Sequence, residues 1–162
     1  MKKLFYIGAL STLLLAACGE EAAPKEKDST QPVQAEAEKS KTLTVGDTAE
    51  FKDAKFTLKA VSTTDARNEF DETKPNQVIK IEYELENLAK DELSYGMDLT
   101  VYDGAGNKME SYALDNSMGA VASGKKVQGV QHFGIMEGGK IEIHYAPIIS
   151  FDKAAIFEVD VK

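Results

Sequence analysis

Hydrophobic and polar positions alternate most clearly between Gln77 and Asn87. Apolar and charged side chains follow one another there as Ile79, Lys80, Ile81, Glu82, Tyr83, Glu84, Leu85 and Glu86. A period of two, with apolar residues on one side and charged residues on the other, predicts a half-buried antiparallel β-strand. The charged side would face water, so we expect the sheet that holds this strand to be covered on one side only.

Shorter runs repeat the alternation through the rest of the chain. They lie at residues 56–60, 99–102, 127–135, 141–145 and 157–161. Glycine-containing turns separate the runs, at residues 46–47, 103–107, 123–124 and 137–139. Six or seven short strands spaced in this way predict an all-β fold, an antiparallel β-sandwich. Residues 62–75 are polar and predict a long loop, while residues 111–122 predict a second irregular segment with room for a short helical turn.

The first residues follow a different pattern, that of an export signal. Lys2 and Lys3 precede an apolar run that ends at Ala17. The run is too short to cross a bilayer of ~30 Å, which takes ~20 apolar residues, so we expect it to be cleaved. Its end, Leu15-Ala16-Ala17-Cys18, resembles the lipobox of bacterial lipoproteins. That resemblance implies cleavage before Cys18 and a diacylglyceryl thioether on its sulfur; the alternative is an ordinary signal peptide that ends near a cysteine.

A polar spacer separates this signal from the alternating runs. Residues 20–41 hold six acids, four lysines and two prolines, with Val33 as the one branched apolar side chain. Such a segment cannot bury enough surface to offset the entropy of ordering it. The predicted organisation is therefore a signal peptide at 1–17, the lipidated cysteine and a flexible linker at 18–41, and one β-sandwich domain at 42–162. Cys18 is the sole cysteine, so the domain has no disulfide to stabilise it.

The chain is acidic, with a formal net charge of −8. Removal of residues 1–17 takes away two lysines and no acid, which leaves the mature protein at −10. Phosphate repulsion makes such a protein a poor ligand for nucleic acid or for an anionic lipid surface. The charge indicates either solubility at the cell envelope or attraction to cations or a basic partner.

Several motifs of the domain occur in an order that resembles a known family. They are Val45-Gly46-Asp47-Thr48, the strand end Glu86-Asn87, the hairpin Tyr102-Asp103-Gly104 and the run from Ala122 to Val127. This order resembles the telokin-like, immunoglobulin-like domain of unknown function that many Gram-positive lipoproteins carry, which is similar to a mycobacterial immunoprotective extracellular antigen. The resemblance implies an immunoglobulin-like sandwich outside the membrane. It supplies no catalytic residues.

Two histidines and four methionines are the candidates for a metal site. His132 and His144 both alternate with apolar neighbours and are expected to point outward, where they could meet if their strands were adjacent. Zinc or copper would need a third ligand. Thioethers that could serve copper(I) are offered by Met97, Met109, Met118 and Met136. The spacing matches no metal motif, so exposed histidines and scattered methionines are the competing interpretation.

Other catalytic signatures are missing from the sequence. There is no Gly-x-Ser-x-Gly motif and no glycine-rich phosphate loop, and residues 103–107 read as a hairpin and not as a calcium loop. Tyrosines at 95, 102, 112 and 145 are expected in core or edge packing with their hydroxyls in water, or else as contact residues. The acids at 65, 69, 71 and 72 form either a solvated charge run or a partner-binding loop.

We therefore predict a non-catalytic binding module without a cofactor. It would be held on the extracytoplasmic side of the cell membrane through Cys18 and would bind an envelope or extracellular protein or polymer. The expected contact surfaces are residues 62–75 and 111–122, since loops at the ends of a sandwich commonly bind partners. The alternative is a lipoprotein that handles a small ligand, copper or zinc, with His132 and His144 as ligands.

Overall fold

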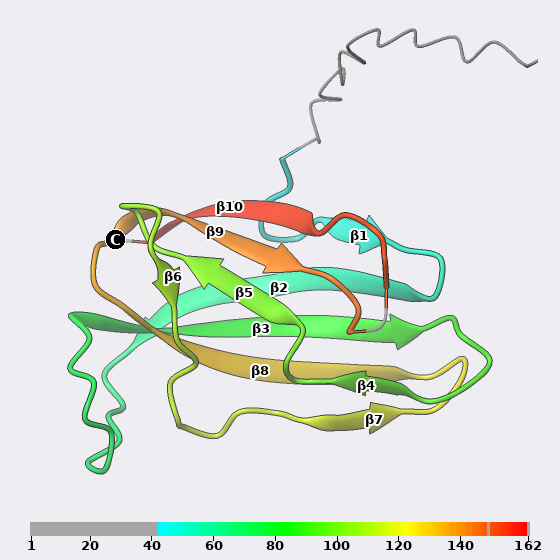
Figure 1. The fold of residues 1–162 in the computed structure, drawn as a ribbon, viewed down its shortest axis with the longest axis horizontal. Coiled ribbons are helices and arrows are strands. Elements are labelled where there is room, and N and C mark those ends of the chain that lie inside the picture. The colour runs from blue at the N-terminus through cyan, green and yellow to red at the C-terminus, as the bar shows by residue number, and fades with distance from the viewer. Residues whose placement is uncertain (1–41, 149, 162) are drawn as a thin grey trace, which may run out of the picture. The chain divides into compact units, whose positions relative to one another are not determined.

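The computed structural model describes residues 42–148 and 150–161. This part of the chain is built from antiparallel strands and contains no helix, and hence none long and apolar enough to cross a membrane (Figure 1). The predicted all-β class is confirmed. The predicted signal peptide at 1–17 and the linker at 18–41, including Cys18, lie outside the described residues.

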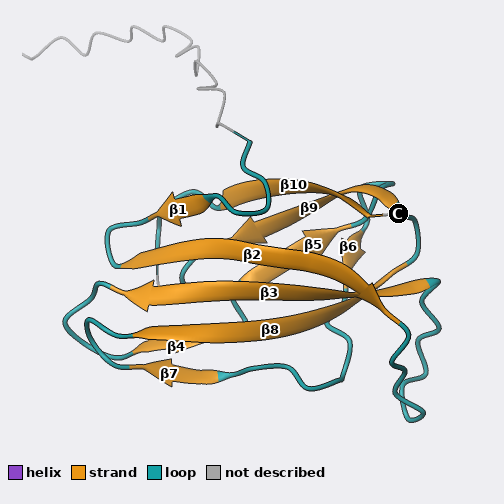
Figure 2. Cartoon of the chain, turned by 180° about the vertical axis from the view of Figure 1, so that it is seen from behind, coloured by secondary structure: helices purple, strands orange, loops and turns teal. Residues whose placement is uncertain are grey.

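Two four-stranded sheets form the sandwich, one on each side of a shared core (Figure 2). In the first sheet the order is β1 (Thr48–Glu50), β2 (Ala54–Thr64), β3 (Gln77–Asn87) and β8 (Lys126–Ile135). In the second sheet the order is β10 (Ala155–Val161), β9 (Gly139–Tyr145), β5 (Leu99–Tyr102) and β6 (Lys108–Met109). A separate two-stranded ribbon consists of β4 (Leu93–Tyr95) and β7 (Gly119–Val121).

Strand β3 faces the core as its alternation predicts. Its apolar side chains are almost fully buried, with exposures of 0% for Ile79, Ile81 and Leu85 and 1% for Tyr83. Its acidic side chains lie on the other side, where Lys126 of β8 forms ion pairs with Glu84 at 3.2 Å and Glu86 at 3.3 Å. A half-buried sheet thus explains the strict period of two.

An aromatic stack fills the centre of the core. The ring of Phe56 lies 4.1 Å from that of Tyr145 and 5.2 Å from that of Tyr83, both in stacked geometry. Tyr83 pairs across the sheet with Gly129 of β8. A Cβ atom at Gly129 would lie 2.2 Å from Cζ of Tyr83, so only glycine leaves room for the ring.

The structure corrects three details of the sequence prediction. The described residues form ten strands instead of six or seven. Strand β2 continues to Thr64, so the first loop covers residues 65–76 instead of 62–75. Residues 111–122 contain no helical turn, because they extend along the edge of β8 and then enter β7.

Candidate functional site

The segment that links β6 to β7, residues 110–118, runs along the free edge of β8. We call it the edge segment. Two of its amides donate to β8 carbonyls, Tyr112 to His132 at 2.8 Å and Ser117 to Val130 at 2.8 Å. The segment is therefore fixed to the first sheet although it has no strand alternation of its own.

Two side chains of the edge segment accept hydrogen bonds from two amides on this edge of β8. The His132 N–H donates to Asn116 Oδ1 at 2.8 Å, and the Val130 N–H donates to Ser117 Oγ at 3.0 Å. Asn116 is itself held by its Nδ2, which donates to the Tyr112 carbonyl at 2.8 Å. The edge of β8 is thus closed to the addition of another strand at these positions.

His132 lies beneath this segment and is only 7% exposed. Its side of β8 is opposite to the core, as predicted, but the prediction of an exposed ring is wrong because Asn116 covers it, with Nδ1 2.8 Å from Asn116 Oδ1. Burial lowers the pKa of His132, and the charge of Lys80 lowers it further, while Asp115 opposes both effects. The surroundings of the imidazole therefore favour its neutral form over its charged form.

His144 belongs to the other sheet. It lies on the outer side of β9, with Nε2 2.8 Å from Glu142 Oε2 and its ring 4.9 Å from that of Tyr102. Strands β8 and β9 are not neighbours in a sheet, so the two histidines do not meet. Within residues 42–148 and 150–161, no three His, Cys, Asp or Glu side chains gather as metal ligands would.

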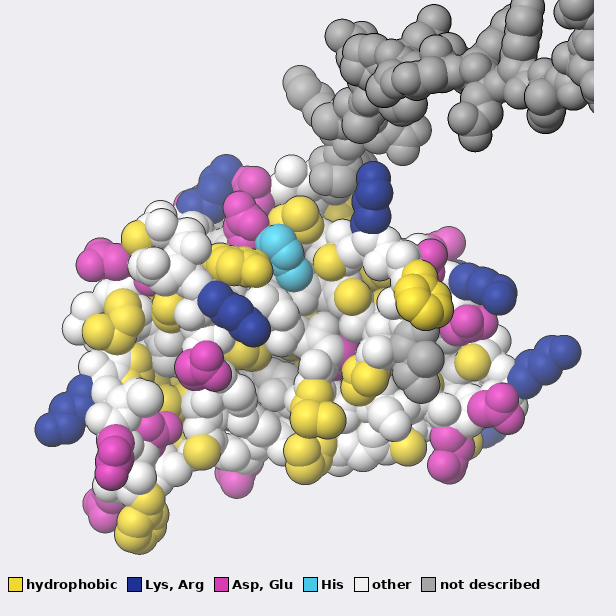
Figure 3. Space-filling model, viewed as in Figure 1, with side chains coloured by type: hydrophobic (Ala, Val, Ile, Leu, Met, Phe, Trp, Pro, Cys, Tyr) yellow, Lys and Arg dark blue, Asp and Glu magenta, His cyan; other side chains and the backbone are white. Residues whose placement is uncertain are grey.

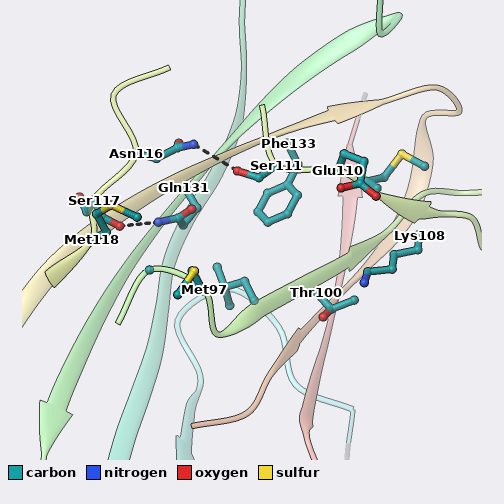
Figure 4. A pocket seen from close by; sticks show the side chains of 13 residues that line it. Met97, Thr100, Lys108, Glu110, Ser111, Asn116, Ser117, Met118, Gln131 and Phe133 are labelled. Atoms are coloured by element: carbon teal, nitrogen blue, oxygen red, sulfur yellow. Dashed lines mark hydrogen bonds between the residues drawn. The ribbon is translucent and has the colours of Figure 1, made fainter. Parts of the chain in front are cut away.

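A cavity of about 350 Å³ opens between the two sheets, beside the edge segment. We call it the inter-sheet pocket. Its walls come from the turn before β5, from β5, β6 and β8, and from the edge segment: Gly96, Met97, Leu99, Thr100, Lys108, Met109, Glu110, Ser111, Asn116, Ser117, Met118, Gln131 and Phe133. Figure 4 shows Met97 and Met118 towards one end and Lys108 and Glu110 towards the other.

Two methionines form the exposed rim of this pocket. Met97 is 78% exposed and Met118 is 69% exposed, whereas Met109 is buried in the wall. Three of the four methionines singled out in the sequence thus share one cavity, and Met136 lies outside it. Sequence reasoning missed the polar residues of the pocket, such as Thr100 and Gln131, because nothing in the local pattern indicates that their strands converge.

The turn at Gly96 holds the two rim methionines together. Gly96 has a φ of 107°, which favours glycine, and a Cβ atom there would lie 2.6 Å from the Ser117 carbonyl oxygen and 2.8 Å from Met118 Cα. This close approach joins the residue before Met97 directly to the edge segment. Across the pocket wall, Gln131 Nε2 donates to the Ser117 carbonyl. The frame of the pocket is therefore fixed by the close backbone approach at Gly96 and by the hydrogen bond from the Gln131 side chain.

A buried acid lies next to this turn. Asp98 is 7% exposed; its Oδ1 accepts from the Gly96 N–H at 3.2 Å, while its Oδ2 has no hydrogen-bond partner among the described residues. The buried hydroxyls of Tyr83 and Tyr145 are likewise unpartnered there, so the expectation of a water-exposed hydroxyl is wrong for Tyr145. Burial raises the pKa of Asp98, and burial together with the Asp98 charge raises the pKa of both tyrosines.

The structure brings the two predicted contact loops together. The Asn68 N–H donates to the Tyr112 hydroxyl at 3.0 Å, and Asn68 Nδ2 donates to the Ala113 carbonyl at 2.9 Å. A shallow hollow between them is lined by residues 67–70 and 113–115. The edge segment therefore contributes both to this hollow and to the inter-sheet pocket.

Comparison with other proteins agrees with this architecture. The Bacillus subtilis protein ycdA, described as a "putative lipoprotein", is 25% identical over 70% of this chain with a TM-score of 0.60, and the match spans 38% of the length of ycdA. The yjhA protein of Bacillus subtilis is 20% identical over 74% of this chain and all of its own, with a TM-score of 0.59. The secreted protein MPT63 of Mycobacterium tuberculosis is 10% identical over 73% of this chain and 96% of its own, with a TM-score of 0.56.

The sequence comparisons identify the family. No curated protein sequence matches the chain. The family model described as "Domain of unknown function (DUF4352)" matches residues 43–156, which is most of the β-sandwich. The suspected relationship to lipoprotein domains and to the mycobacterial antigen is thereby confirmed, and the chain belongs to the DUF4352 family.

Proposed function

We propose that this protein is a non-catalytic binding module held on the outer face of the cell membrane by a lipid on Cys18. Three observations support the location: the tetrad Leu15-Ala16-Ala17-Cys18, the similarity to a protein described as a "putative lipoprotein", and the shared fold with a secreted protein. The proposed organisation is a cleaved segment at 1–17, a linker at 18–41 and a domain at 42–162. The linker gives the domain reach above the bilayer.

The observation that carries the binding role is the rim of the inter-sheet pocket. Met97 and Met118 expose most of their side chains beside a cavity whose frame is fixed by the close approach at Gly96 and the hydrogen bond from Gln131. Unbranched thioether side chains adapt to partners of different shape and are common on surfaces that bind protein segments. We infer that a partner protein of the envelope or the extracellular space places an apolar side chain against these methionines.

Two polar side chains in the pocket wall have a structural role. The amide groups of Asn116 and Gln131 are committed to backbone carbonyls of the edge segment. Lys108 and Glu110 are exposed. The proposed binding role therefore does not require these polar groups to take part in a reaction.

Crosslinking from the pocket rim tests this proposal. The full-length protein, with a photoreactive residue at position 100 of the pocket, would be irradiated on intact cells of the producing bacterium. The discrete crosslinked species should fall at least tenfold in M97S/M118S and persist in M136S, because Met136 is a half-exposed methionine outside the pocket. Equal capture in all three proteins would contradict the proposal.

A soft-metal site is the second candidate, because Met97, Met109 and Met118 line one cavity. Anaerobic titration of the purified protein with copper(I) decides between the two. We expect no one-to-one complex tighter than about micromolar, which corresponds to roughly −8.2 kcal/mol. A tighter complex that M97S/M118S abolishes would favour metal handling instead.

A further inference from the structure

A projecting aromatic side chain marks a second point of contact, at the loop between β2 and β3. This loop, residues 65–76, extends from one end of the sandwich, at the lower left of Figure 1. Phe70 lies at its turn and is 93% exposed. Phenylalanine is a residue that proteins usually bury, and aromatic anchors dominate the energetics of protein interfaces.

We propose that Phe70 and the carboxylates around it form a docking knob for a partner protein whose surface presents an apolar socket ringed by lysine or arginine. The inference rests on the proposed binding function and names the chemistry of a partner. We call this feature the Phe70 knob: Phe70 with Asp65, Glu69, Asp71 and Glu72.

The loop is ordered by its own hydrogen bonds. The Phe70 N–H donates to Asn68 Oδ1 at 2.9 Å, and the Asp71 N–H donates to the Asn68 carbonyl at 3.2 Å. The Thr73 N–H donates to Asp71 Oδ1 at 2.8 Å. Asn68 also holds the loop to Tyr112 and to the edge segment, as described above. A preorganised anchor loses less entropy on binding, so this order favours recognition through Phe70.

The charges around the aromatic ring select the partner. Four acids and two bases lie in residues 65–76, and the guanidinium of Arg67 folds back onto the loop, with Nη1 2.8 Å from the Thr64 carbonyl oxygen and 2.9 Å from that of Ala66. Figure 3 shows hydrophobic atoms at the end of the projecting loop with acidic side chains beside them. Carboxylates next to the ring repel an anionic bilayer surface and complement a basic rim on a protein.

Phe151 offers a matched control. It is also fully exposed, at 105%, but it lies in the segment before β10, where Asp152 and Lys153 follow it with opposite charges. An effect confined to position 70 would therefore reflect the acidic surroundings of the ordered loop and not exposure of a phenylalanine alone.

Site-directed crosslinking on intact cells tests the inference with the full-length lipoprotein. p-Benzoylphenylalanine would replace Phe70 in one protein and Phe151 in another, and the crosslinked peptides would be sequenced. We expect a discrete protein adduct from position 70, mapped among lysine or arginine residues of the partner. The yield should fall at least tenfold when E69K and E72K are added, and the adduct from position 151 should be absent or unaffected by these charges.

The opposite results overturn the inference. They are an adduct with lipid, an adduct on an acidic or uncharged surface, a yield insensitive to E69K/E72K, or no adduct at position 70. Circular dichroism of each purified variant checks that the sandwich is folded. If position 70 gives no adduct while capture from the inter-sheet pocket persists, the Phe70 knob is wrong and the binding function stands; loss of both refutes the binding function as well.

Discussion

Asp98 shows at the scale of one residue how burial changes the behaviour of an acid. Its Oδ2 is buried and has no hydrogen-bond partner within residues 42–148 and 150–161, which disfavours the charged form, and burial raises the pKa of Asp98 above the ordinary 3.8. Because Asn keeps an acceptor for the Gly96 N–H and carries no charge, Asp98→Asn should raise the free energy of unfolding at pH 7. Urea denaturation measures this change.

The pH dependence supplies the control for Asp98. A raised pKa in the folded protein means that stability is gained as the pH falls through that pKa towards 3.8, so the advantage of Asp98→Asn should shrink over this range. By contrast, Asp103→Asn should lower the free energy of unfolding at pH 7. Burial favours the neutral form of Asp103, but hydrogen bonds from Asn107 and Ala105 outweigh it and lower the pKa of Asp103. An unchanged or lower stability of Asp98→Asn would contradict this account.

His132 should make the domain sensitive to mild acid. Its pKa in the folded protein lies below the ordinary value of 6.5, so the unfolded chain takes up a proton first. The contribution of neutral His132 to the free energy of unfolding is therefore fully present above about pH 6.5. It is lost as the pH falls from there towards the pKa of His132 in the folded protein. Thermal denaturation between pH 7.5 and 5 should show this loss, and His132→Gln should reduce it. His144→Gln keeps His132 and should retain the slope; equal slopes in both variants would refute the assignment.

At the scale of one element, strand β3 allows a direct test of which side chains point to the core and which point to water. Ile81 is fully buried, so Ile81→Ala should lower the free energy of unfolding by ~2–5 kcal/mol. Glu82 lies on the solvent side in an ion pair with Lys80 at 2.8 Å, and Glu82→Ala should stay within about 0.5 kcal/mol of the parent. Equilibrium denaturation in urea compares the two. Similar losses from both variants would contradict the assignment of Ile81 to the core side and Glu82 to the solvent side.

The same strand shows what the sequence can predict and why. Because β3 is buried on one side and solvated on the other, apolar and charged residues alternate along it, and this period of two can be recognised in the sequence. The edge segment has no such pattern, since side chains of Asn116 and Ser117 form bonds that backbone groups form in a strand. The cover over His132 and the pocket beside Gln131 arise from this distant segment. The sequence alone identifies the loops and methionines that take part. It does not predict that they cover His132 or form a pocket, because the contacting residues are far apart in the chain.

At the scale of the whole molecule, the lipid on Cys18 is the first prediction to test. Cys18→Ser removes the thiol that the lipid would modify, so the protein should be released into the medium or remain unprocessed. Cell fractionation and gel mobility of the mature form report this. A variant that stays with the membrane at the parent's mature size would rule out the lipid anchor.

The boundary of the domain is a second prediction at this scale. A chain that starts at Lys41 keeps every strand of the sandwich and should give a β-rich circular dichroism spectrum and a cooperative thermal transition. A chain that starts at Ala49 serves as the control. It lacks Leu43, whose amide and carbonyl bond to β10. Loss of cooperative unfolding already in the longer chain would place part of residues 18–41 in the domain.

The way Asn116 and Ser117 cover β8 has a consequence for proteins crowded on a surface. If the proposed lipid anchor holds many copies on one membrane, they would meet at high local concentration, where an open strand edge on each copy would favour edge-to-edge pairing. Here two short polar side chains occupy the bonds that an invading strand would need. The exposed pocket rim therefore lies beside a strand whose edge amides at Val130 and His132 are already occupied within the same molecule.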